Sequence, residues 1–175
     1  MNQLKTYFNL KDKKRTNHPN KVVVHHTGGI NNNPSADTSH HTAKMVENYH
    51  LSLGWEGIGY HWFIERDGTE WQGRPEHRHG AHTIGQNKKS IGICLAGNFD
   101  VTKPTEAQEM ALTARLNKIV AKTGIKTIEP HRKYAKKTCY GSKLSDTWAS
   151  DLIINPLAEY TIKELIDEIL RRIRR

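Results

Sequence analysis

Two short apolar runs constrain the fold of this chain more than any other feature of its sequence. Val22, Val23 and Val24 form a β-branched run that ends at two histidines and a Gly-Gly pair, and SIGICLAGNF at 90–99 is apolar at successive positions. Such short runs are typical of buried strands. A strand that is apolar at successive positions has both faces covered, as in the centre of a layered sheet. We therefore expect a sheet with further layers packed against it.

Two other segments carry the spacing of amphipathic helices. Apolar residues recur at helical intervals from about Asp37 to Leu53, with Asp37 or Ser35 as the N-cap and Gly54 as the stop. The segment TEAQEMALTARLNKIVAKTG at 105–124 shows the same pattern, beginning at a threonine and stopping at a glycine. We predict a helix in each segment.

The fold class follows from how these elements alternate along the chain. GYHWFIERDGTEWQG at 59–73 contains two strand-like runs joined by Asp67 and Gly68, a pair suited to a tight hairpin turn. A further short strand, IKTIEPH at 125–131, follows the second helix. Alternating strands and helices together with a hairpin predict a single α/β domain, with a mixed central β-sheet flanked by helices.

The 175 residues of the chain are enough for one domain with a buried core. We predict a polar N-terminal segment at 1–20, a core domain at 21–155 and an amphipathic C-terminal helix at 156–175. No apolar run approaches the roughly 20 residues of a membrane helix, so no transmembrane segment is expected. The N-terminus also lacks the apolar stretch of a secretion signal.

The formal net charge of +9 predicts attraction to a polyanion. Nucleic acid, anionic lipid and the phosphate-rich polymers of bacterial walls all satisfy this expectation, and charge alone does not choose among them. The two cysteines lie in different settings, since Cys94 belongs to an apolar run and Cys139 follows a basic loop. Both are expected to be free thiols or metal ligands.

Histidines and a cysteine gather where the predicted strands end. His25 and His26 close the first strand, His131 closes a later one, and Cys139 follows after a short basic loop. Because side chains alternate across a strand, only one member of the histidine pair can join a given site. Imidazole and thiolate are common zinc ligands, and a catalytic zinc keeps three protein ligands and one open position. On spacing alone, a basic surface loop with an incidental thiol is the alternative.

Three motifs, read together, resemble a known family. VVVHHTGG at 22–29, the stretch at 59–100 and PHRKYAKKTC at 130–139 resemble the zinc-dependent N-acetylmuramoyl-L-alanine amidases of the phage-lysozyme and peptidoglycan-recognition-protein superfamily. The resemblance covers most of the chain, with the motifs in the family's order. It implies that His25, His131 and Cys139 bind Zn²⁺.

The resemblance also implies catalytic roles for Tyr60 and Lys137. Amide hydrolysis needs a nucleophile at neutral pH and stabilisation of charge on the carbonyl oxygen, and zinc supplies both. Lys137 is expected to stabilise the oxyanion. Tyr60 would either orient a water molecule or pass a proton to the departing amine. A solvated lysine and a core aromatic are the alternative interpretations of these two residues.

Four more residues are candidates for substrate binding. His82 resembles a family position that lines the substrate groove, and it would either contact substrate or support a zinc ligand. Trp71, Arg74 and Asn87 flank the same region and could stack on or hydrogen-bond an extended sugar-peptide ligand. His26 is expected to play a structural part.

The resemblance implies a catalytic domain at 21–155 that hydrolyses the bond between N-acetylmuramic acid and L-alanine in peptidoglycan. The alternative is a non-catalytic peptidoglycan-binding module that needs no metal. The expected partners are the glycan strand with its stem peptide and anionic wall polymers, with no nucleic acid, and the chain is expected to be a monomer. It would reach the wall from a host cytoplasm after holin-type release, or be secreted within a longer chain. The C-terminal helix would dock on the domain or lead to a wall-binding module.

Overall fold

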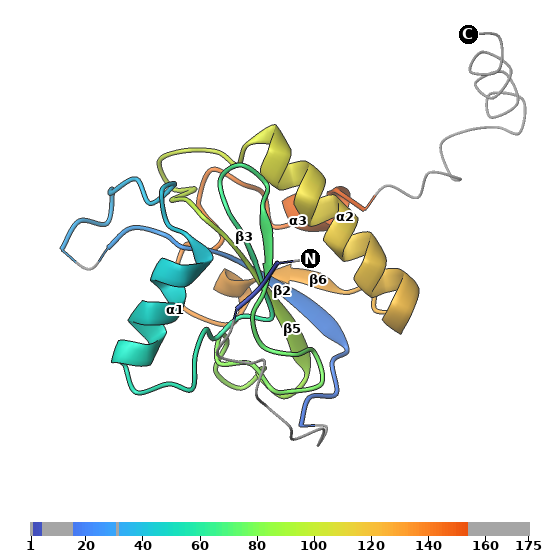
Figure 1. The fold of residues 1–175 in the computed structure, drawn as a ribbon. Helices are drawn as coiled ribbons and strands as arrows, with labels where there is room; N and C mark the ends of the chain where they lie inside the picture. Colours follow the sequence, from blue (N-terminus) through green and yellow to red (C-terminus); the bar gives the residue numbers. More distant parts are fainter. Residues whose placement is uncertain (1, 5–15, 31, 154–175) are drawn as a thin grey trace, which may run out of the picture.

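A mixed six-stranded sheet forms the centre of the computed structural model, which describes residues 2–4, 16–30 and 32–153 (Figure 1). The strands are β1 (Asn2–Gln3), β2 (Lys21–His26), β3 (Trp62–Ile64), β4 (Glu70–Gln72), β5 (Ser90–Leu95) and β6 (Ile128–Pro130). The helices are α1 (Ala43–Ser52), α2 (Glu106–Thr123) and α3 (Trp148–Asp151), with a 3-10 turn η2 (His131–Lys133). The strand order is β1-β4-β3-β5-β2-β6.

Strands β2 and β5 lie side by side at the centre of this sheet. They pair in parallel from Lys21 with Ser90 to His26 with Leu95. Every residue of the two strands is buried except Lys21, which is partly exposed. Helices α1 and α2 lie on opposite sides of the sheet in Figure 1. The prediction of central strands covered on both faces is therefore confirmed.

The α2 side of the sheet holds the larger core cluster. Leu112, Leu116 and Ile119 recur every three to four residues, so all three side chains lie on one face of α2 and pack on the sheet. The cluster contains Val22, Val24, Trp62, Ile64, Ile91, Ile93, Leu95, Phe99, Leu112, Leu116, Ile119, Ile125, Ile128, Tyr140 and Ala149. Burying one such side chain stabilises the fold by about 1.5–3 kcal/mol relative to leaving it exposed.

The α1 side holds a smaller cluster and, toward the ends of the strands, polar residues. Its buried members are Leu4, Ala43, Val46, Ile58, Phe63, Cys94 and Ala96. Because side chains alternate along a strand, the valines packed on the α2 side leave His25 on the α1 side. There it pairs in register with Cys94 of the neighbouring strand. Polar side chains, including that of His25, therefore follow the smaller core at the end of β2.

Local signals placed several elements correctly. Strands β3 and β4 form the antiparallel hairpin predicted around Asp67 and Gly68, and Gly68 adopts the left-handed conformation with φ of 85°. Helix α2 begins after Thr105, whose side chain accepts a hydrogen bond from the backbone N–H of Gln108 at 3.1 Å. It ends at Gly124, again in the left-handed conformation.

The predicted start of the first helix was wrong. Helix α1 begins at Ala43 rather than near Asp37, because Thr42 is the N-cap and accepts a hydrogen bond from the backbone of Met45 at 3.2 Å. The carboxylate of Asp37 instead accepts a hydrogen bond from the backbone of Ser39 at 2.9 Å, which holds a turn. The expected N-cap at Asp37 therefore lies five residues before the observed N-cap at Thr42.

Polar residues near the N-terminus are attached to the sheet. Strand β1 pairs in parallel with β4 at the sheet edge, and Leu4 is buried in the smaller core. Asn17 is fully buried, and its side-chain amide donates hydrogen bonds to the carbonyl oxygens of Ser90 and Glu76. The helix predicted at 156–175 lies outside the described residues. Within the described part of the chain, no helix has both the length and the apolar character of a membrane span.

Truncating Leu112 to alanine tests the α2 packing. Leu112 is fully buried, so Leu112→Ala should lower the free energy of unfolding by about 2–5 kcal/mol through lost burial and a cavity. Met110 lies on the same helix with 67% of its surface exposed, and Met110→Ala should change the value by less than about 0.5 kcal/mol. Urea denaturation followed by circular dichroism measures both, and equal losses would contradict the packing described here.

Candidate functional site

The ends of two parallel strands bring the first two candidate ligands together. Strands β2 and β6 pair in parallel, with Val24 opposite Pro130, so His25 and His131 each follow the last paired residue. Parallel strands end at the same edge of a sheet. The two imidazole rings accordingly lie with their centroids 4.4 Å apart.

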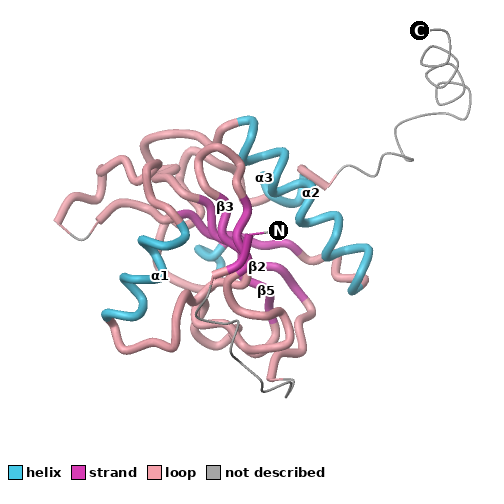
Figure 2. The backbone as a smooth tube through the Cα atoms, in the orientation of Figure 1, coloured by secondary structure: helices cyan, strands magenta, loops and turns pink. Residues whose placement is uncertain are grey.

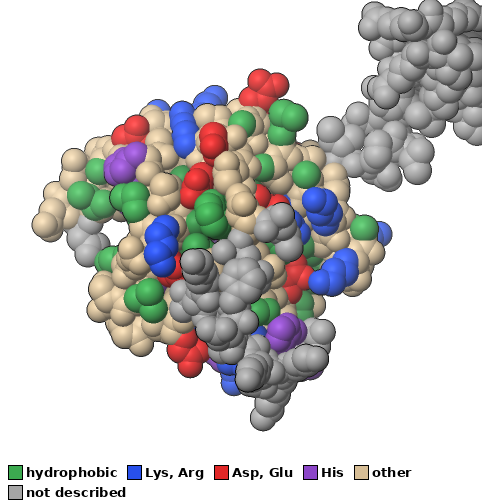
Figure 3. Space-filling view, viewed as in Figure 1, with side chains coloured by type: hydrophobic (Ala, Val, Ile, Leu, Met, Phe, Trp, Pro, Cys, Tyr) green, Lys and Arg blue, Asp and Glu red, His purple; other side chains and the backbone are tan. Residues whose placement is uncertain are grey.

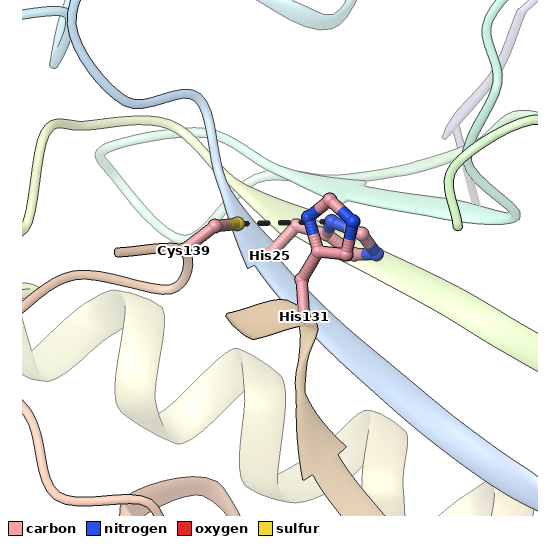
Figure 4. Close-up of side chains that lie close together, drawn as sticks. All are labelled: His25, His131 and Cys139. Carbon is pink, nitrogen blue, oxygen red and sulfur yellow. Dashed lines mark hydrogen bonds between the residues drawn. The ribbon is translucent and has the colours of Figure 1, made fainter. Parts of the chain in front are cut away.

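Cys139 completes the cluster from the loop after η2. One ligand atom from each of His25, His131 and Cys139 can be chosen so that all three lie within 4.8 Å of one another. The Sγ atom of Cys139 is 3.7 Å from Nδ1 of His25, and Figure 4 shows the three side chains converging. Zinc bonds of about 2.0–2.3 Å to nitrogen and sulfur place tetrahedral ligands about 3.5 Å apart. These residues therefore fit zinc with three protein ligands.

Arg132 holds the loop that carries the thiol. Its backbone N–H donates to the carbonyl oxygen of Cys139 at 2.6 Å. Its guanidinium donates to the carbonyl oxygens of Gly141 and Leu144, both at 2.7 Å, and to the carboxylate of Asp146 at 2.5 Å. A single arginine next to His131 thus ties the preceding strand end to the cysteine loop.

Asp100 fastens the other side of this loop. Its carboxylate accepts hydrogen bonds from the hydroxyl of Thr138 and the backbone N–H of Ser142, each at 2.6 Å. Asp100 follows β5, so the loop is attached to two separate parts of the sheet. The position of Cys139 is therefore set by contacts that involve no metal.

Burial keeps the candidate ligands uncharged. It lowers the pKa of His25 well below 6.5, and repulsion from His82 and His131 lowers that pKa further. The pKa of His131 is also lowered, first by burial and then by Lys137. An unprotonated imidazole has a lone pair for a metal. Burial also raises the pKa of the Cys139 thiol to about 12, so a metal must displace its proton on binding.

His26 points to the opposite face of β2, as the alternation of side chains predicts. Its Nδ1 accepts a hydrogen bond from the backbone N–H of Phe99 at 2.9 Å, and the two rings lie 5.7 Å apart. Phe99 belongs to the α2-side core. Burial lowers the pKa of His26 to about 4. His26 therefore packs against the core and is not part of the cluster.

Tyr60 and Lys137 line the same cavity as the three ligands. The cavity encloses about 570 Å³, and the ring of Tyr60 lies 5.1 Å from that of His25. Burial raises the pKa of Tyr60 well above 10, and the Cys94 and Cys139 thiols add to the effect. The phenol therefore keeps its proton at neutral pH. Lys137 is exposed at the rim, where its charged end meets solvent.

Two further cavities adjoin the first one and share lining residues with it. One shares Tyr60 and the loop after β2 and extends toward α1. The other shares His131 and Lys137. The lining residues that these two cavities do not share with the first are His41, Val46, Tyr49 and His50 in the cavity toward α1, and Trp55, Ala81, His82, Thr83, Ile84, Asn87, Tyr134 and Ala135 in the other. The three cavities share lining residues and together form a groove that contains the cluster.

Among the predicted substrate-binding residues, His82 and Asn87 lie at this groove. The side-chain oxygen of Asn87 accepts hydrogen bonds from the backbone N–H groups of His82 and Thr83, both at 2.8 Å. Nδ1 of His82 lies 3.0 Å from Nε2 of His25. Asn87 therefore shapes the turn that presents His82 to the cluster.

Trp71 and Arg74 are not brought to the groove. Trp71 packs against the smaller core, and Arg74 is buried, donating from Nε to the carbonyl oxygen of Ile58 and from Nη1 to that of His79. Neither is among the residues that line the three cavities. The prediction that they contact substrate gains no support from this geometry.

The sequence-based predictions gave no functional role to three residues that lie near the cluster. Thr83 places its hydroxyl 3.3 Å from Nε2 of His25, Cys94 lies opposite His25 in the sheet, and His61 stacks edge-on against His82 with ring centroids 5.6 Å apart. No local pattern marks these positions, because their importance depends on which strands are neighbours. Only the adjacency of Thr83 to His82 offered a signal.

Comparison with known proteins agrees with the arrangement of the site. The family profile described as N-acetylmuramoyl-L-alanine amidase matches residues 15–142. The endolysin of Escherichia phage T7 is 33% identical over 116 residues, which cover 63% of this chain and 77% of the relative. Peptidoglycan-recognition protein SC2 of Drosophila simulans is 35% identical over 137 residues, covering 74% of this chain and 73% of the relative.

A solved structure shares the fold. The N-acetylmuramoyl-L-alanine amidase LysC from Clostridium intestinale URNW superimposes with a TM-score of 0.72 at 29% sequence identity. The match covers 86% of this chain and 94% of that protein. The similarity therefore includes nearly the whole of a known amidase rather than an isolated motif.

Behind the cluster, His61 is held in one tautomer. Its Nδ1 accepts a hydrogen bond from the backbone N–H of Gly92, and Nε2 donates to the carbonyl oxygen of Arg78, both at 2.9 Å. Burial lowers the pKa of His61 from 6.5 to about 4, although the Arg78 carbonyl partly opposes the shift. The charged or titratable neighbours that also act on it are Glu76, which raises the pKa, and Arg74 and His79, which lower it.

This lowered pKa predicts a loss of stability in acid. The unfolded chain takes up a proton on this histidine below about pH 6.5, whereas the folded protein resists until about pH 4. His61 alone should therefore remove about 2 kcal/mol of unfolding free energy between pH 7 and pH 5. Urea denaturation of the metal-free protein and of His61→Asn measures this, and the variant should lose less stability over that interval. Equal pH dependence in the two proteins would refute the assignment.

Proposed function

The chain belongs to the N-acetylmuramoyl-L-alanine amidase family, and we propose that it works with a zinc ion held by His25, His131 and Cys139. It is a peptidoglycan amidase, which hydrolyses the bond between N-acetylmuramic acid and L-alanine. The observation that carries the zinc proposal is the convergence of two uncharged imidazoles and one thiol within 4.8 Å. These three side chains come from separate segments of the chain.

Zinc in such a three-ligand site supplies Lewis acidity, which polarises a carbonyl group and makes water a nucleophile near neutral pH. The protein supplies the other groups. Lys137 lies beside His131 and Cys139 in the lining of the cavity, and we assign it to the negative charge that develops on the carbonyl oxygen. Tyr60 keeps its proton, so its phenol can donate to the departing amine nitrogen.

The groove and the surface charge fit a wall polymer as substrate. The cavities that adjoin the cluster offer room for a glycan strand and its stem peptide. The net charge of +9 favours anionic wall polymers as additional partners. Figure 3 shows acidic side chains interspersed with the basic ones on one face, so the attraction is spread over that face rather than concentrated. Similarity to phage endolysins supports the bacterial cell wall as the place of action.

A non-catalytic peptidoglycan-binding module is the second candidate function. Similarity to a protein named for peptidoglycan recognition raises this alternative, whereas the amidase family profile and the endolysin relative support the enzyme. Such a module needs the groove, but it has no need for three metal-binding side chains with a lysine and a tyrosine beside them. The complete set in this cavity supports the enzyme.

Removal of the metal should abolish hydrolysis. The purified protein is expected to release new alanine amino groups from peptidoglycan, to stop in chelator and to recover with added zinc. Cys139→Ser should lose bound zinc, measured by elemental analysis, together with turnover. Cys94→Ala removes the only other thiol and should keep one zinc per chain. Full activity in chelator would exclude the zinc mechanism, and binding of peptidoglycan without amine release would favour the recognition module.

Lys137 should affect the rate and leave metal binding intact. Removing one stabilising group for an oxyanion lowers kcat about 100- to 1000-fold at comparable sites, so Lys137→Ala should fall in this range with unchanged zinc content. The neighbouring Lys136, which is also exposed but does not line the cavity of the cluster, provides the control, and Lys136→Ala should keep the wild-type kcat. A normal kcat for Lys137→Ala would overturn this role.

A further inference from the structure

We propose that His82 is a positioning residue that acts through His25. Its Nδ1 accepts a hydrogen bond from the Nε2–H of His25 and thereby keeps His25 in the tautomer whose Nδ1 is free to bind metal. This inference rests on the proposed zinc site. Of the two roles that the sequence left open for His82, contact with substrate and support of a zinc ligand, it selects the second.

The orientation of His25 determines which of its nitrogen atoms carries the proton. Nδ1 is the atom that faces the thiol of Cys139, at 3.7 Å, so it is the nitrogen on the metal side. A neutral imidazole carries one proton, and a metal ligand needs a lone pair, so the proton of His25 belongs on Nε2. Nε2 therefore needs an acceptor inside the protein.

Two atoms lie within reach of that Nε2–H. Nδ1 of His82 is 3.0 Å away, and the hydroxyl oxygen of Thr83 is 3.3 Å away. These two atoms are themselves 2.9 Å apart, so the Thr83 hydroxyl can donate to the same Nδ1. The shorter distance makes His82 the acceptor. With Nδ1 accepting, the proton of a neutral His82 lies on its own Nε2.

The ring of His82 is confined in a slot between two glycines. A Cβ atom on Gly92 would lie 2.5 Å from Cδ2 of His82, and one on Gly80 would lie 2.3 Å from the same atom. Both distances are shorter than any tolerated contact, so larger residues at these positions would displace the ring. His61 closes the slot, with its ring at 78° to that of His82. The slot fixes the direction in which Nδ1 points.

Neither nitrogen of His82 can reach a substrate. Nδ1 is engaged with His25 and Thr83, and Nε2 is buried with no hydrogen-bond partner among the residues that the structure describes. An unsatisfied buried N–H costs free energy, so it calls for an explanation. The hydrogen bond at Nδ1 supplies that explanation. If Nδ1 of His82 accepts a hydrogen bond from His25, the proton of His82 must lie on the buried Nε2.

Two variants of similar size separate hydrogen bonding from packing. His82→Asn places a side-chain oxygen near the position of Nδ1, whereas His82→Leu has no acceptor. Loss of a group that orients a metal-bound histidine typically weakens metal binding 10- to 100-fold. The zinc dissociation constant of His82→Leu should rise by about this factor, and that of His82→Asn by less than about threefold. Competition of the metal-free proteins with a chromogenic chelator for zinc measures these values.

Further measurements distinguish the competing explanations. Thr83→Val should bind zinc within about threefold of wild type, and zinc-loaded His82→Asn should keep the wild-type KM for peptidoglycan fragments. Wild-type zinc affinity in His82→Leu, or equal weakening in both His82 variants, would overturn the inference. So would weakening in Thr83→Val alone, because Thr83 would then be the acceptor. Urea denaturation of the metal-free variants checks that each is folded.

One measurement needs no variant. The ¹⁵N chemical shifts of the imidazole of His25 in the metal-free wild type report its tautomer, and we expect the proton on Nε2. A proton on Nδ1 would contradict the role of His82 even if every variant misfolds. Failure of the wild type itself to bind zinc would instead disprove the zinc site, so the two ideas fail in different ways.

Discussion

The register of β2 between its two parallel neighbours is the constraint on which the site depends. β5 and β6 flank this strand, and together they set which residues lie at the sheet edge. Because side chains alternate, a slip by one residue would turn His25 toward α2 and bring His26 to the groove. The buried valines on both faces of β2 oppose that slip. Packing of the core therefore decides which histidine meets the cysteine.

The site combines two electrical environments within one cavity. The candidate ligands are largely withdrawn from water and stay uncharged, which suits metal binding. Lys137 lines the same cavity but is an exposed residue, so its charge is accessible to water. Lys137 and Cys139 are only two residues apart, yet Lys137 is exposed and Cys139 is buried. One short loop therefore supplies both the charged group and the buried thiol.

Local patterns in the sequence were sufficient for the hairpin at Asp67–Gly68, for α2 with its threonine and glycine boundaries, and for the central strand β5. They failed at the start of α1, where two capping signals compete, and at β1, whose polar residues join the sheet edge through backbone hydrogen bonds. A backbone-mediated edge strand leaves little trace in side-chain composition. Figure 2 shows the strands gathered at the centre of the molecule, with helices and loops around them. The cluster of His25, His131 and Cys139 was foreseen from strand ends and family resemblance. The surroundings of His82 were not, because they depend on two glycines brought together from separate strands and loops.

The attachment of the cysteine loop through Arg132 and Asp100 bears on how the proposed zinc site would be filled. In many small metal sites the ligands are gathered by the ion itself, and the entropy lost in gathering them weakens the observed affinity. Here one salt bridge, between Arg132 and Asp146, and several hydrogen bonds already hold the thiol next to the imidazoles. For the proposed zinc site, folding would therefore not have to wait for the ion. A chain made where free zinc is scarce would reach its final shape first and bind the ion later.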